Sequence, residues 1–152
     1  MPNYKGHLVG GFFVYCIIIF CLLAQTPSLF LGAEWLLCTL LGALFPDIDT
    51  KSKGRKIFYR TLFGLAIIFL YKQRVRALFL LLIIAIIPSL VRHRGIFHTW
   101  WFVVGLPLGL ICYSKICLPA YATLITADAL FFIAGALSHL WLDLGIKRMF
   151  RW

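Results

Sequence analysis

Acidic residues and histidines are scarce in this sequence of 152 residues, which has five Asp and Glu and four His against fifteen Lys and Arg. Charged residues make up only 13% of the chain, whereas a typical soluble domain has about 25%. Hydrophobic residues reach 62%. This composition excludes an ordinary soluble domain and predicts an integral membrane protein.

The formal net charge of +10 could suggest binding to nucleic acid. The basic residues, however, lie in short clusters between apolar runs and not along one polar surface. Such clusters orient membrane helices and contact anionic headgroups. We therefore expect membrane lipid, and no nucleic acid, as a partner.

Cysteine pairs are also missing. The chain has five cysteines, an odd number, and no Cys-x-x-Cys spacing. This pattern argues against a disulfide framework and against a thiolate metal cage, so we expect the cysteines to be small, buried hydrophobic residues. The sequence also lacks internal repeats and long linkers, which predicts a single integral membrane domain over residues 1–152.

Six apolar runs divide the chain. They lie at 8–24, 31–46, 57–71, 77–91, 99–114 and 121–144. They predict an all-α, polytopic membrane helical bundle with four to six transmembrane or re-entrant helices, because some runs are short against the roughly 20 residues that cross a bilayer core. The third and fourth runs could span the membrane or dip into it. In both cases the chain returns to the side that it left.

The distribution of basic residues orients these helices. With a cytoplasmic N-terminus, eleven of the fifteen Lys and Arg fall in cytoplasmic segments. The positive-inside rule therefore predicts that both termini are cytoplasmic.

Most of the few histidines and aspartates fall into four short motifs. The motifs are GHLVGG with His7, FPDIDT with Asp47 and Asp49, HRGIFHT with His93 and His98, and SHLWLD with His139 and Asp143. In the predicted topology every motif lies at or near a cytoplasmic helix end. Segments far apart in sequence should therefore converge on one face of the membrane.

Local geometry in these motifs suits metal binding. His139 and Asp143 are four residues apart and share one helix face. Pro46 should end the second helix, and an extended Asp-Ile-Asp would point both carboxylates to one side. A turn at Gly95 could bring His93 and His98 together.

Imidazole combined with carboxylate favours Zn first, with Mn or Fe as alternatives, over Ca. Seven candidate ligands exceed the needs of one tetrahedral ion, so they indicate either two ions or one ion with supporting groups and a general base. Each residue alone has an ordinary explanation, such as a helix cap or a headgroup contact. The joint set favours a metal site.

The sequence resembles the YdjM-like family of bacterial inner-membrane proteins, which are described as LexA-regulated metal-dependent hydrolases. The resemblance rests on four motifs that occur in order among the apolar runs: Gly-His, Pro-Asp-Ile-Asp, His-Arg-Gly-x-x-His-Thr and Ser-His-x-x-x-Asp. The similarity covers nearly the whole chain. It implies a multi-pass protein of the bacterial inner membrane with a hydrolytic metal site, and it implies no substrate. By motif match, the metal-site residues are His7, Asp47, Asp49, His93, His98, His139 and Asp143, with Arg94 beside them.

We expect hydrolysis of a phosphoester or ester in a lipid or other amphiphilic substrate, at the cytoplasmic membrane interface. The expected catalytic residues are an Asp base, drawn from Asp47, Asp49 and Asp143, and Arg94 as a clamp for the anionic group. Two alternatives stay open. One is a metal-ion or proton-coupled transporter, and the other is an inactive protein in which a metal only ties helix ends together.

Overall fold

The computed structural model describes residues 3–22, 27–49, 52–73, 85–86 and 96–145, with the side chain of Asp49 excepted. These residues form helices and contain no strand. The predicted all-α fold is therefore confirmed. The run predicted at 77–91 lies outside the described residues, apart from the short stretch 85–86.

Four helical segments are long and apolar enough to cross a membrane. They are α1 (Tyr4–Cys21), α2 (Leu29–Leu44) with the 3-10 turn η1 (Phe45–Asp49), α5 (Trp100–Cys117), and α6 (Ala122–Leu144) with the preceding turn η3 (Pro119–Tyr121). The predicted runs begin and end within four residues of these helices. The prediction of a polytopic membrane bundle is confirmed.

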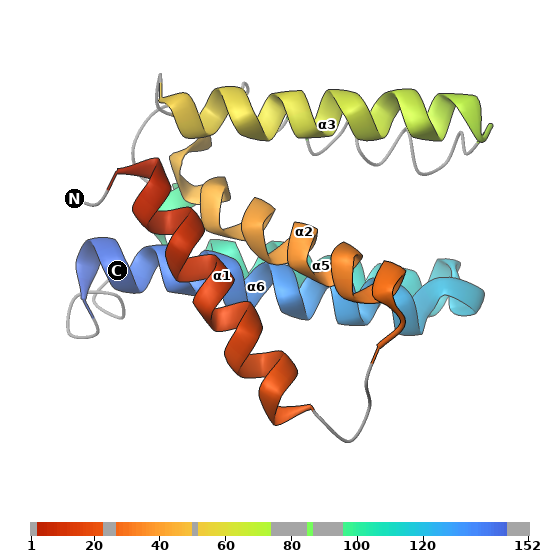
Figure 1. Cartoon of the computed structure of the whole chain (residues 1–152). Coiled ribbons are helices and arrows are strands. Elements are labelled where there is room, and N and C mark those ends of the chain that lie inside the picture. Colours follow the sequence, from red (N-terminus) through yellow and green to blue (C-terminus); the bar gives the residue numbers. More distant parts are fainter. Residues whose placement is uncertain (1–2, 23–26, 50–51, 74–84, 87–95, 146–152) are drawn as a thin grey trace.

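A fifth helix, α3 (Lys53–Tyr71), has a different character. Its first eight residues include four basic ones, and it is not among the four candidate spans. The side chain of Ser52 caps its first turn by accepting a hydrogen bond from the N–H of Arg55 at 3.0 Å. Figure 1 shows α3 running alongside the bundle.

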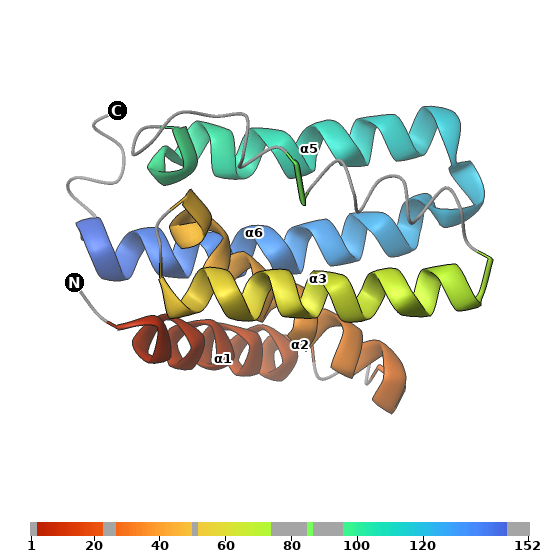
Figure 2. The same ribbon diagram turned by 90° about the horizontal axis from the view of Figure 1, so that it is seen from above.

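Helix α6 is the centre of the bundle. It packs most extensively against α2, and then against α5 and α1. Figure 2 shows α6 between α5 and α1, and Figure 1 shows α1 and α2 crossing α6 obliquely. The starts of α1, α3 and α5 and the ends of α2 and α6 therefore lie at one end of the molecule (Figure 1), which we call the site end.

Glycines allow the close crossing of α2 and α6. A Cβ atom at Gly42 would overlap the carbonyl oxygen of Phe132, and one at Gly135 would overlap the carbonyl oxygen of Thr39. Only glycine permits backbones to approach this closely, and small residues at helix interfaces are typical of membrane bundles. The crossing fixes the register between the two helices.

Large apolar side chains cover the outer surface of the helices, including Phe13, Phe20 and Phe30. A patch of this extent suits contact with lipid tails and not with water. All five cysteines are free, and four of them are exposed on this outer surface. The expectation that they are buried is wrong, because a small apolar side chain on a membrane helix can face lipid as readily as protein.

An aromatic core stabilises the site end. Phe45 of η1 packs against Phe58 of α3 and against Phe97 of η2 (Ile96–His98), with ring centroids 6.2 and 5.4 Å apart. All three side chains are at most 2% exposed. Burial of such a side chain contributes roughly 1.5–3 kcal/mol. This core holds the two 3-10 turns next to each other.

Candidate metal centre

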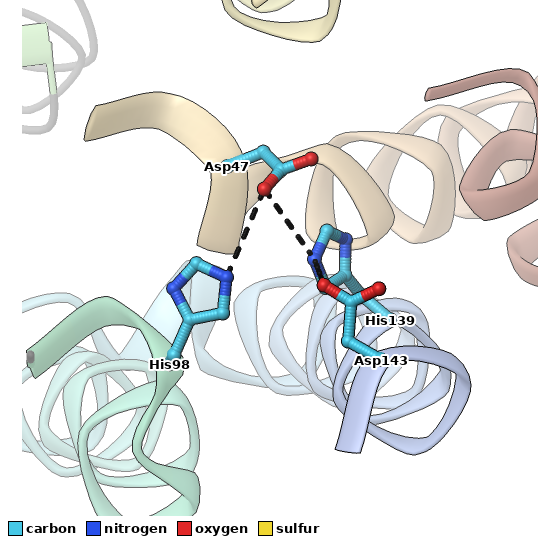
Figure 3. A group of neighbouring side chains, drawn as sticks. All are labelled: Asp47, His98, His139 and Asp143. Carbon is cyan, nitrogen blue, oxygen red and sulfur yellow. Dashed lines mark ion pairs between the residues drawn. The ribbon is translucent and has the colours of Figure 1, made fainter. Parts of the chain in front are cut away.

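Four side chains from three elements converge at the site end. Asp47 comes from η1, His98 from η2, and His139 and Asp143 from the last turns of α6 (Figure 3). Each offers a nitrogen or oxygen atom, and these atoms all lie within 4.8 Å of one another. The structure therefore brings together residues from three of the four motifs.

The candidate ligand atoms are farther apart than hydrogen-bonded atoms would be. The Nε2 atom of His139 lies 3.4 Å from Oδ2 of Asp143 and 3.8 Å from Oδ1 of Asp47, and Nε2 of His98 lies 3.7 Å from the same Asp47 oxygen. Charge-assisted hydrogen bonds would measure about 2.7–2.9 Å. Bonds of about 2.0–2.2 Å to a tetrahedral ion place the ligand atoms about 3.3–3.6 Å apart. The observed spacing fits ligands around an ion better than direct hydrogen bonds.

The backbone fixes the orientation of the His139 ring. Its Nδ1–H donates to the carbonyl oxygen of Ala43 at 2.7 Å, because a carbonyl can only accept. Ala43 lies in the last turn of α2, where carbonyls lack helical partners. A 3-10 bond to this carbonyl would come from residue 46, which is Pro46 and has no N–H. The proline thus leaves the carbonyl available to His139.

This bond leaves Nε2 of His139 as the atom that faces the cluster. In the neutral ring Nε2 carries a lone pair, and it points toward the oxygens of Asp47 and Asp143. Nε2 is buried and has no hydrogen-bond partner among the described residues. A lone pair directed at two carboxylates is unfavourable unless a cation lies between them. The donor set therefore fits a divalent ion.

Asp47 lies in a 3-10 turn, not in an extended segment. Helix α2 ends at Leu44, two residues before the proline, and η1 continues the chain to Asp49. The expectation of an extended Asp-Ile-Asp is wrong, because Phe45 and Ile48 are both buried in the aromatic core and hold the chain in a tight turn. A 3-10 turn directs residues two apart to different sides. The side chain of Asp49 lies outside the described structure.

His98 is held by the turn that precedes α5. The hydroxyl of Thr99 donates to the carbonyl oxygen of Ile96 at 2.6 Å, and the N–H of Thr99 donates to the same oxygen at 3.1 Å. These two bonds close the turn η2 around His98. Phe97 anchors the turn in the core. The imidazole is therefore positioned by its immediate neighbours in sequence.

The centre has a closed side and an open side. The side chain of His139 is fully buried and that of Asp143 is 4% exposed. The side chains of Asp47 and His98 are each 23% exposed. Water or a substrate can therefore approach past Asp47 and His98.

His7 lies beside the group of four, on its closed side. Its ring stacks on His139 with centroids 3.7 Å apart, and its Nε2 atom lies 3.4 Å from Oδ1 of Asp143. It is not among the four residues whose ligand atoms cluster. The structure brings His7 to the site, and its role as a ligand stays a prediction.

Two further predicted residues, His93 and Arg94, lie outside the described residues. Sequence reasoning missed the carbonyl of Ala43, because a backbone acceptor has no sequence signature. It did note Pro46, but only as a helix end. The paired glycines of α2 and α6 were also missed, although small residues facing each other are a recognisable signal in membrane helices.

The fold and the site together define a class. The protein is a polytopic helical membrane protein with a histidine and carboxylate cluster at one end of its bundle. The chain belongs to the YdjM inner membrane protein family, which matches it over residues 1–152. It is thus a multi-pass inner-membrane protein, as the sequence motifs predicted. No curated protein and no solved structure matches the chain.

Proposed function

We propose that this protein is a membrane-bound, metal-dependent hydrolase that acts on a phosphoester or ester of an amphiphilic substrate. One observation supports the proposal most directly. The ligand atoms of Asp47, His98 and His139 lie at separations suited to an ion, and the Nε2 atom of His139 is buried without a hydrogen-bond partner among the described residues.

The donor set supports zinc as the ion, with Mn or Fe as alternatives. Two imidazole nitrogens and two carboxylate oxygens are ligands that these metals accept, whereas Ca takes oxygen. As metal ligands, the two carboxylates would be ionised and the two rings neutral, so the donor set would carry two negative charges. A divalent ion balances that charge in a site with one closed side.

An ion held there would act as a Lewis acid, which would make water nucleophilic near neutral pH and polarise a phosphoryl or carbonyl oxygen. The residues supply orientation and access. His139 is fixed by Ala43, and Asp47 and His98 border the open side through which a substrate would enter.

The carboxylates of the cluster could serve as ligands or as the general base. Asp47 and Asp143 each direct an oxygen toward His139. An oxygen occupied as a ligand is a poor proton acceptor, so the base assignment falls to Asp49 or to an oxygen of Asp47 or Asp143 outside the coordination shell. Arg94 remains the proposed clamp for the anionic group of the substrate.

The position of the centre supports an amphiphilic substrate. It lies at one end of helices that can cross a membrane, where headgroups would be found. The outer surface of these helices is apolar. A lipid could keep its chains in the bilayer while its headgroup reaches the open side.

The test combines metal analysis with turnover. Detergent-purified wild type is assayed for bound metal and for phosphate release from phosphatidic acid in mixed micelles and from p-nitrophenyl phosphate. Asp47→Asn should lose bound metal and at least about 100-fold in turnover, since it removes a ligand that two histidines face. Glu34→Gln is the matched control, because Glu34 is an exposed carboxylate toward the other end of α2.

Wild type without stoichiometric metal would overturn the proposal, as would full activity in Asp47→Asn. Bound metal with no turnover on esters or phosphoesters would favour the inactive alternative, in which the ion ties helix ends together.

Transport of a metal ion or proton is a second candidate. Asp128 in α6 has a carboxylate oxygen that is buried and receives no hydrogen bond from any described residue. An ionisable residue within a span is a functional candidate. Between Asp128 and Ser138, however, α6 contains only apolar residues and glycine, so this helix offers no polar side chain between Asp128 and the site. Liposome flux of zinc or protons that Asp128→Asn abolishes would favour transport.

A further inference from the structure

The stacked pair of His7 and His139 is an unusual feature of the centre. The two rings come from α1 and α6, lie 3.7 Å apart and are tilted by only 14°. Both are buried, at 1% and 0% exposure. Their Nε2 atoms each lie 3.4 Å from Asp143, but they approach different oxygens of that carboxylate.

The stacking prevents the two histidines from sharing one ion. A metal binds imidazole in the plane of the ring, along the lone pair of the nitrogen. Because the two ring planes are nearly parallel, they intersect only on the order of 10 Å from the rings. A zinc–nitrogen bond is much shorter, at about 2.0–2.1 Å. An ion in the plane of His139 therefore lies out of the plane of His7.

Asp143 presents the same geometry to both rings. Its Oδ2 atom faces Nε2 of His139, and its Oδ1 atom faces Nε2 of His7, at equal separations of 3.4 Å. That separation is the one that two ligands of a tetrahedral ion adopt, about 3.3–3.6 Å. One carboxylate thus offers a separate oxygen to each histidine.

We propose that Nε2 of His7 and Oδ1 of Asp143 bind a second divalent ion, so that Asp143 bridges a two-metal centre. This inference rests on the first ion of the proposed function. The described residues supply two ligands to the second ion, which leaves its other positions for water or for an oxygen of the substrate.

Two observations support the second site. Ions in two-metal hydrolytic centres lie about 3.5–4 Å apart, which matches the separation of the stacked rings. In addition, Oδ1 of Asp143 is buried and no described residue donates a hydrogen bond to it. A buried carboxylate oxygen without a partner is costly, and a cation removes that cost.

A simpler role for His7 is to orient Asp143 through a hydrogen bond. At 3.4 Å this contact is longer than the about 2.7–2.9 Å expected for a charge-assisted bond. The two roles differ in metal stoichiometry. The orienting role predicts one ion per chain and weaker binding of that ion without His7, whereas the bridging role predicts two ions and the loss of one.

The experiment compares wild type with His7→Phe, which keeps a ring stacked on His139 but removes its nitrogens. Both proteins are purified without added metal, loaded with manganese and measured for bound ions and by electron paramagnetic resonance. Wild type should bind two ions per chain and show an exchange-coupled spectrum. His7→Phe should bind one ion and show the six-line spectrum of isolated Mn(II).

Tyr15→Phe is the matched control, because it also removes a polar group from α1. The group removed is the hydroxyl that donates to the carbonyl oxygen of Gly32. It should keep two ions. One ion in manganese-saturated wild type would overturn the inference even if His7→Phe failed to fold, and so would two coupled ions in His7→Phe. Two ions without any hydrolysis would overturn the proposed function alone, whereas one ion with hydrolysis would overturn this inference alone.

Discussion

His139 donates its Nδ1–H to the carbonyl oxygen of Ala43 at 2.7 Å, across the most extensive helix interface of the bundle. The bond joins a metal-ligand candidate to the backbone of a different helix. It forms only if α2 and α6 approach closely, which Gly42 and Gly135 allow. The orientation of the imidazole therefore depends on packing one helical turn away from the centre.

Replacing Gly135 with alanine should disturb both stability and metal binding. The added Cβ would overlap the carbonyl oxygen of Thr39, which is backbone and cannot rotate away. Overpacking of this kind costs about 1–3 kcal/mol. The helices must separate, so the bond between His139 and Ala43 should lengthen. Thermal unfolding in detergent should shift downward, and zinc affinity, measured against a competing chelator, should fall about tenfold or more.

Gly105→Ala is the control for this substitution. Gly105 lies in α5, and a Cβ there would meet no atom within 4 Å. Alanine should leave zinc affinity unchanged and keep or slightly raise the thermal midpoint, because it favours helix over glycine by about 1 kcal/mol. Equal effects of the two substitutions would show that the crossing does not control the centre.

Pro46→Ala should weaken metal binding without removing a ligand. Alanine restores an N–H that can bond to the carbonyl oxygen of Ala43 and compete with His139. Groups that orient a metal-binding histidine change affinity by about 10–100-fold. We expect a loss of that size in a zinc competition titration. Pro107→Ala, within α5, should leave the affinity unchanged.

Much of the fold could be predicted because the bilayer imposes simple rules. Runs of apolar residues mark the helices. The run predicted at 121–144, for example, begins one residue before the observed helix α6 (Ala122–Leu144) and ends at the same residue. The sequence also predicted that His98, His139 and Asp143 lie near one another, because the positive-inside rule places their helix ends on the same side of the membrane, and the structure brings the three side chains together.

The details of the centre could not be predicted, because they depend on tertiary contacts. The spacing of the FPDIDT motif is equally compatible with an extended segment and a 3-10 turn, and only the burial of Phe45 and Ile48 selects the turn. The stacking of His7 on His139 requires the packing of α1 against α6, which no local pattern encodes.

Thr99→Val should loosen the turn that holds His98. The substitution keeps the shape of the side chain but removes the hydroxyl that donates to the carbonyl oxygen of Ile96 at 2.6 Å. His98 would then sample other orientations, and zinc affinity should fall about tenfold. Thr61→Val is a close control. The hydroxyl of Thr61 also donates to a backbone carbonyl, that of Ile57 at 3.1 Å, but Thr61 lies in α3 and not in the turn that holds His98. A similar loss in both variants would contradict a specific role for Thr99.

Removing the metal should destabilise the whole bundle, because its proposed ligands come from η1, η2 and α6 and the ion links them. An ion present at 1,000 times its dissociation constant stabilises the folded state by about 4 kcal/mol. For a chain of this size that corresponds to a fall of roughly 8–16 °C in the thermal midpoint when EDTA is added. His98→Ala, which lacks one ligand, should respond less than wild type. Asp128→Asn removes a carboxylate that lies in α6 at a distance from the cluster, so this variant should respond like wild type. If EDTA shifts wild type and His98→Ala equally, the chelator acts somewhere other than this centre.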